Sequence, residues 1–80
     1  MKQRKIMLPT LDDAKAFVAA ANKCDFDIDV FYNRVIIDAK SILGVLSLDL
    51  TKILTVTYDG DDEAFETFLD SKIPSGNTAA

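Results

Sequence analysis

The sequence predicts a small α+β domain, an open-faced β-sandwich in which three helices cover one face of a four-stranded antiparallel sheet. One observation is the alternation of aspartates with apolar residues at 25–30, which is typical of a strand with one face in water. Another is the three- and four-residue spacing of apolar side chains at 11–21, which indicates an amphipathic helix. The remaining runs are too short for parallel crossovers throughout. The order strand-helix-strand-strand-helix-strand-helix therefore favours an antiparallel sheet with its helices on one face.

The N-terminal part is predicted to be an irregular strand followed by a regular helix. Met1–Leu8 carries three of the nine basic residues, which is typical of an edge strand, and Pro9 ends it. Thr10 can cap a helix that ends near Cys24, and two carboxylates in its first turn complement the helix dipole. The inward stripe of this helix is expected to be Leu11, Ala14, Phe17, Val18 and Ala21.

The middle of the chain is predicted to be a hairpin followed by a short helix. The strand at 25–30 turns at Asn33-Arg34, because Asn tolerates a positive φ, and 35–38 returns as its partner. A second helix is expected from Ser41 to Leu48. The residues of the strand at 25–30 that should face the core are Phe26, Ile28 and Val30.

The C-terminal part is predicted to be a strand and a last helix. The β-branched run 53–58 forms the strand, Asp59-Gly60 turns the chain, and the helix extends from Asp61 to about Ser71, with Ile73-Pro74 as its stop. One domain is expected over residues 1–73, with 74–80 as a flexible tail. The inward residues of these elements are expected to be Leu54, Val56, Tyr58, Ala64, Phe65, Phe68 and Leu69.

Composition excludes several classes of partner. The chain of 80 residues, 49% apolar and 28% charged, can form one globular domain with a small core. Its net charge of −4 argues against nucleic acid as a partner. No apolar run approaches the roughly 20 residues of a membrane-spanning helix, and the N-terminus has no secretory signal pattern. We therefore expect a cytoplasmic protein.

The residue types also exclude several chemistries. Without His and with one Cys, the chain has no imidazole base, no phosphohistidine, no internal disulfide and no His or Cys metal cluster. Cys24 is expected to be a small core residue. The acids near the last helix lack the spacing of a calcium loop and are predicted to form a turn and a dipole complement; they are Asp59, Asp61, Asp62 and Glu63. The sequence thus predicts no metal, no cofactor, no catalytic residue and no enzyme.

One segment resembles a known family. The run Lys40–Leu48, KSILGVLSL, resembles the regulatory-serine segment of HPr, the histidine-containing phosphocarrier of the bacterial sugar phosphotransferase system. The preceding hairpin and the acidic stretch 59–63 also lie where that family has its own, so the resemblance extends from Asp25 to Leu69. It implies a four-stranded antiparallel sheet with three helices, as derived above from the residues.

The resemblance fails at the start of the first helix. HPr carries its phosphoryl group there on a His within a Gly-x-His-Ala-Arg-Pro motif, whereas this chain has Met7 to Asp13, MLPTLDD. The position of the assisting Arg falls at or near Asp12. A carboxylate about 4–5 Å from a phosphoryl group would cost on the order of 3–4 kcal/mol for each repulsive contact. Thr10 cannot replace imidazole as the acceptor, so we expect phosphoryl transfer to be absent.

Ser41 is the candidate modification site. In HPr relatives of many low-GC Gram-positive bacteria the equivalent serine is phosphorylated by a dedicated kinase, and the resemblance implies the same for Ser41. A phosphate there would meet the free amides of a helix N-terminus, with Lys40 adjacent. The alternative is that Ser41 is an ordinary N-cap that contributes about 1 kcal/mol without modification.

The same helix carries the candidate partner-binding surface, Ile42, Leu43 and Leu46 together with Lys40. The apolar residues of a helix of about eight residues cannot all face one core, so some apolar surface should be exposed. In HPr the matching residues dock enzyme I, sugar-specific components and a transcriptional regulator. The alternatives are a helix packed more deeply or a patch buried in a homodimer.

These observations predict a non-catalytic, HPr-like regulatory or protein-binding module, with phosphorylation of Ser41 as its regulation. The alternative is an atypical phosphocarrier of the phosphotransferase system, and a purely structural role in a larger assembly is a third interpretation. The expected partners are phosphotransferase-system components, a serine kinase or a transcriptional regulator, and the expected state is a monomer or weak homodimer.

Overall fold

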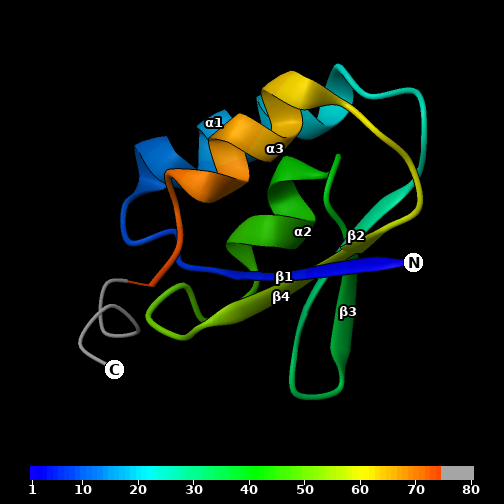
Figure 1. The fold of residues 1–80 in the computed structure, drawn as a ribbon. Helices are drawn as coiled ribbons and strands as arrows, with labels where there is room; N and C mark the ends of the chain where they lie inside the picture. The colour runs from blue at the N-terminus through cyan, green and yellow to red at the C-terminus, as the bar shows by residue number, and fades with distance from the viewer. Residues whose placement is uncertain (75–80) are drawn as a thin grey trace.

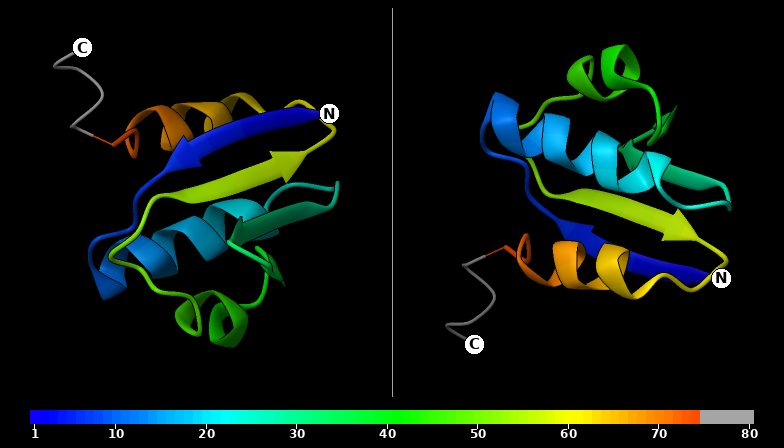
Figure 2. Two further views of the ribbon diagram at one scale, coloured as in Figure 1. Left: turned by 90° about the horizontal axis from the view of Figure 1, so that it is seen from below. Right: turned by 90° about the horizontal axis from the view of Figure 1, so that it is seen from above.

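A four-stranded antiparallel sheet with three helices on one of its faces is seen in the computed structural model, which describes residues 1–74. In the sheet the strands lie in the order β1 (Lys2–Ile6), β4 (Leu54–Tyr58), β2 (Ile28–Tyr32) and β3 (Val35–Asp38), so β1 is an edge strand as predicted. Figures 1 and 2 show that the helices lie together on one face while the other face of the sheet is open. The predicted fold class is confirmed. The helices are α1 (Leu11–Asn22), which follows β1, α2 (Ile42–Leu46), which follows β3, and α3 (Glu63–Asp70), which follows β4.

The hairpin forms at the predicted turn. Tyr32 pairs with Val35, and Asn33 between them has a φ of 55°, the left-handed conformation that Asn tolerates. β2 begins at Ile28 instead of Asp25, since its pairing with β4 starts with Ile28 opposite Tyr58. The predicted alternation still holds, because Ile28 and Val30 are buried while Asp27 and Asp29 are exposed.

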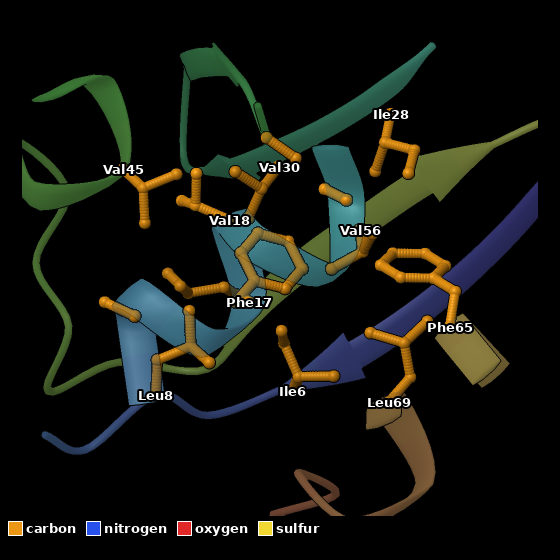
Figure 3. Packing of buried hydrophobic residues seen from close by; sticks show 14 of the residues in the cluster. Ile6, Leu8, Phe17, Val18, Ile28, Val30, Val45, Val56, Phe65 and Leu69 are labelled. Carbon is orange, nitrogen blue, oxygen red and sulfur yellow. The ribbon is translucent and has the colours of Figure 1, made fainter. Parts of the chain in front are cut away.

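The core lies between the sheet and the helices (Figure 3). The predicted inner face of β4 is buried, and the Phe17 ring of α1 lies 6.3 Å from the Phe65 ring of α3. Tyr58 meets the same Phe65 edge-on, with ring centroids 5.3 Å apart. Cys24 is buried, which confirms the interpretation as a small core residue, and desolvation raises the pKa of its thiol. Leu8 follows β1 and is also buried.

Two predicted core residues are wrong. Leu11, the first residue of α1, is 51% exposed. The buried residues of this helix begin one turn later, at Ala14. Ala64 is exposed as well, since α3 begins at Glu63 and directs Phe65 and Leu69, four residues apart, toward the sheet. Ala64 precedes Phe65 by one residue and therefore points about 100° away from it.

Helix ends also differ from prediction. α2 ends at Leu46 instead of Leu48, because the N–H of Ser47 turns back to the carbonyl of Gly44, and Leu48 is buried outside the helix. α3 ends at Asp70, before the predicted Pro stop. Of the predicted tail, Pro74 is buried and residues 75–80 lie outside the described residues. Within residues 1–74, no helix is long and apolar enough to cross a membrane.

Candidate functional site

The N-terminus of α2 is capped by Ser41. Its backbone is extended (φ −102°, ψ 108°), and its Oγ accepts a hydrogen bond of 3.1 Å from the backbone N–H of Gly44. Ser41 is exposed. Ser41 is therefore a helix cap in this structure, and its hydroxyl is accessible on the surface.

The three apolar candidates on α2 differ in exposure. Leu43 is 80% exposed and Leu46 is 38% exposed, whereas Ile42 is half-buried and packs against the core. Val45, on the opposite side of the helix, is fully buried. The expectation that these residues cannot all face the core is confirmed, and the exposed apolar surface consists mainly of the two leucines.

A close approach of α2 to β3 fixes this orientation. A Cβ atom added to Gly44 would lie 2.5 Å from Cγ2 of Ile37, so only glycine fits between the helix and the strand. α2 is thereby held over β3, with Val45 directed into the core (Figure 3). The glycine inside the predicted helix was visible in the sequence, but its contact with Ile37 was not.

Lys40 is held by the end of α1. Its Nζ donates a hydrogen bond of 2.9 Å to the backbone carbonyl of Cys24. Its own carbonyl accepts a bond of 3.1 Å from Nδ2 of Asn22, which also donates to the carbonyl of Val18. These contacts tie the segment before α2 to the C-terminus of α1. No sequence pattern indicated them, because residues 18 to 24 and Lys40 come together only in the folded chain.

The start of α1, where the resemblance places the phosphohistidine, carries no imidazole. Thr10 caps the helix by accepting a bond of 3.1 Å from the N–H of Asp13, as predicted. Nζ of Lys72 lies 2.7 Å from Oδ1 of Asp13, and both side chains are partly buried. The ion pair lines a hollow of about 320 Å³ together with Met7, Pro9 and the segment 71–74. Lys72, the cation that lines this hollow among the described residues, is already paired with a carboxylate.

The Asp13–Lys72 pair should make stability sensitive to acid. The hydrogen bonds from Lys72 and Thr10 lower the pKa of Asp13 from its ordinary value. A carboxyl whose pKa is lower in the folded state contributes stability that is present above its unfolded pKa of about 4 and is lost as the pH falls through the folded pKa. We expect the melting temperature of Asp13→Asn to decline less than that of the parent protein on acidification below about pH 4. Asp12→Asn is the matched control, and an identical acid profile for Asp13→Asn and the parent would contradict the prediction.

In the acidic stretch at the start of α3, Glu63 lies in the first turn of the helix, where the predicted dipole complement places it, and Asp62 caps the helix, which was not predicted. Oδ1 of Asp62 accepts a bond of 2.8 Å from the N–H of Phe65, and Asp61 pairs with Lys2 of β1. Among the residues described, no group of three or more His, Cys, Asp or Glu side chains is arranged to hold a metal ion.

Comparisons with known proteins agree with this geometry. The family model described as the PTS HPr component phosphorylation site matches residues 12–70. The chain is similar to HPr-C-His from Thermoanaerobacter tengcongensis, at 26% identity and a TM-score of 0.73 over 89% of this chain and 93% of that one. It is similar to the phosphocarrier protein HPr from Bacillus anthracis, at 27% identity and a TM-score of 0.68 over 89% of this chain and 95% of that one.

A third structure shares the fold. Crh of Bacillus subtilis, a catabolite repression protein found there as a swapped dimer, is 22% identical, with a TM-score of 0.61 over 88% of each chain. The match to the family model covers most of the chain, and the order of strands and helices is that of the predicted HPr fold. This chain belongs to the HPr family of the phosphotransferase system.

Proposed function

We propose that this HPr-family protein is a non-catalytic regulatory module that binds protein partners through α2 and does not carry a phosphoryl group on histidine. The observation that carries the proposal is the exposure of Leu43, which is 80% accessible beside the exposed hydroxyl of Ser41. The absence of any His supports the second half of the proposal. So does the start of α1, where Lys72 is neutralised by Asp13.

The binding surface, here called the α2 patch, consists of Leu43 and Leu46 with part of Ile42. Leu43 and Leu46 are accessible apolar side chains on a helix whose Val45 is fully buried and whose Gly44 lies close against Ile37 of β3. An exposed apolar side chain on a helix is suited to fill a pocket on a partner, because the backbone that carries it is already ordered by its packing on the core. Lys40 lies at the rim but is bound to the carbonyl of Cys24, so its contribution is to position the helix. Phosphotransferase-system components and a transcriptional regulator are the proposed classes of partner.

Phosphorylation of Ser41 is the proposed regulation of this patch. The Oγ atom is accessible, and a phosphate there would place about two negative charges next to the apolar surface. Modified by a serine kinase, Ser41 would therefore change which partners bind. The test is incubation with an HPr serine kinase and ATP, followed by intact mass. Ser41→Ala should abolish the added phosphate, and Ser47→Ala, at the other end of α2, should not.

The protein should not accept phosphate from enzyme I. Incubation with enzyme I and phosphoenolpyruvate is expected to leave its intact mass unchanged, because there is no imidazole and the start of α1 carries carboxylates. An acid-labile gain of one phosphate, about 80 Da, dependent on enzyme I would contradict this. That outcome would support an atypical phosphocarrier, the alternative that the family match at 12–70 favours. Thr10→His alone should also remain unmodified, since the supporting cation is missing.

A further inference from the structure

The two edges of the sheet are protected differently. β1 carries Lys2, Arg4 and Lys5, and such charges oppose pairing with another strand. The other edge, β3, has the sequence Val-Ile-Ile-Asp, with Ile36 67% exposed and Val35 50% exposed. Figure 1 shows the hairpin of β2 and β3 projecting away from the helices. β3 is therefore an accessible apolar edge strand, and it lacks the basic residues that oppose strand pairing at β1.

The backbone of β3 presents free hydrogen-bonding groups at this edge. The N–H of Ala39 donates a hydrogen bond of 2.9 Å to the carbonyl of Ile28, so these two residues form a hydrogen-bonded pair. In an antiparallel ladder, hydrogen-bonded and non-hydrogen-bonded residue pairs alternate along the strands. The hydrogen-bonded pairs with β2 are therefore those of Ile37 and Val35, and the N–H and C=O of Ile36 point outward. Within residues 1–74, nothing else bonds to these two groups, whereas the carbonyl of Asp38, which also points outward, accepts a hydrogen bond of 3.0 Å from the N–H of Ser41.

We propose that two copies of this chain pair through β3, antiparallel and centred on Ile36, to form one continuous eight-stranded sheet. In this register Ile36 of each copy exchanges both backbone hydrogen bonds with Ile36 of the other. Arg34 and Asp38 lie two residues on either side of Ile36, so Arg34 of each copy meets Asp38 of the other. The edge is complementary to itself in charge as well as in hydrogen bonding. This way of pairing differs from a domain swap in which two copies exchange β1, and from a dimer that forms through the α2 patch.

Packing on both faces favours the same arrangement. On the open face, the two Ile36 side chains meet, each flanked by Phe31, its partner in β2. On the helix face, the exposed Val35 of each copy meets Ile37 of the other. α2 covers only the end of β3 near Ile37, where Gly44 approaches it. Antiparallel pairing places this covered end beside the projecting hairpin of the second copy, so the two α2 helices do not oppose each other.

The interface is small, so the dimer should be weak, with a dissociation constant of about 10 µM to 1 mM. Sedimentation equilibrium over this range of concentration is the test. Arg34→Glu and Asp38→Lys should each weaken self-association about tenfold or more, because each places like charges at both ends of the interface. Mixing the two variants should restore association, since every charged pair is then opposite in sign. Ile36→Lys should abolish the dimer, and Gln3→Lys on β1 is the matched control that should not.

Amide chemical shifts identify the surface directly. Dilution should move the N–H resonance of Ile36 and leave those of Lys2–Ile6 unchanged. A protein that stays monomeric up to about 1 mM overturns the proposal. A dimer that is lost in Leu43→Asp also overturns it, and so does a dimer whose dilution moves the amide resonances of β1 instead of that of Ile36. A mixture of Arg34→Glu and Asp38→Lys that fails to associate is a further contrary result. Circular dichroism of each variant establishes that it is folded, which is expected because Arg34, Ile36 and Asp38 are exposed. Asp38→Lys also removes the hydrogen bond of 2.9 Å that Oδ1 of Asp38 accepts from the N–H of Lys40, so its spectrum is compared with that of the parent protein first.

Discussion

A Val45→Asp variant should be largely unfolded, whereas Leu43→Asp should fold with nearly the stability of the parent protein. Val45 is fully buried, and a carboxylate there would have no partner, at a cost of several kcal/mol, about the whole stability of a small domain. Leu43 is 80% exposed, so its replacement should change the free energy of unfolding by about 0.5 kcal/mol or less. Leu46→Asp should lie between them, close to Leu43→Asp. Urea unfolding measures all three.

The same variants separate binding from folding. If Leu43 anchors a partner, Leu43→Asp should weaken capture of that partner at least about fivefold while the protein remains folded. Ser41→Asp should alter the same capture, because its charge lies beside the patch. Glu63→Gln, exposed at the start of α3, is the matched control. Equal melting losses for Leu43→Asp and Val45→Asp would place both residues in the core and remove the main support for the α2 patch.

Local patterns predicted most of the fold because each depends on neighbours in sequence. The cap at Thr10, the turn at Asn33 and the alternation before Val30 are properties of a few adjacent residues. The two residues that were wrongly predicted to be in the core depend instead on long-range packing. Leu11 and Ala64 have the helical spacing of inward residues, but their burial depends on where the helices end above the sheet and how they are rotated.

The candidate site was predictable to the same extent. The cap at Ser41 follows from its position before α2, and exposure of some apolar residues follows from the shortness of that helix. Which of them is exposed is decided by the contact of Gly44 with Ile37, a long-range contact that no local pattern encodes. The contact of Lys40 with the carbonyl of Cys24 is of the same kind.

Replacement of Glu66 on α3 should destabilise the protein substantially. Its Oε2 accepts a hydrogen bond from the hydroxyl of Tyr58, whose side chain is buried, and its Oε1 lies 2.7 Å from Nη1 of Arg4 on β1. Arg4 also pairs with Asp70. Glu66→Ala leaves the phenol of Tyr58 buried without its acceptor, so we expect a loss of about 2–3 kcal/mol in urea unfolding. Tyr58→Phe should cost about 1 kcal/mol, since Glu66 keeps its bond to Arg4.

Titration of Tyr58 tests the same contact at alkaline pH. Burial and then the hydrogen bond to Glu66 raise the pKa of Tyr58 to about 12. Because the unfolded phenol ionises near about 10, the stability this residue contributes is complete below pH 10 and is lost as the pH rises toward 12, by about 2–3 kcal/mol in all. Tyrosinate absorbance in a Tyr32→Phe background reports Tyr58 alone and should rise near pH 12. Glu66→Ala should bring this midpoint down, but not to 10, since burial persists. If Tyr58 ionises near pH 10 in the folded Tyr32→Phe protein, with and without Glu66→Ala, then neither burial nor Glu66 raises its pKa.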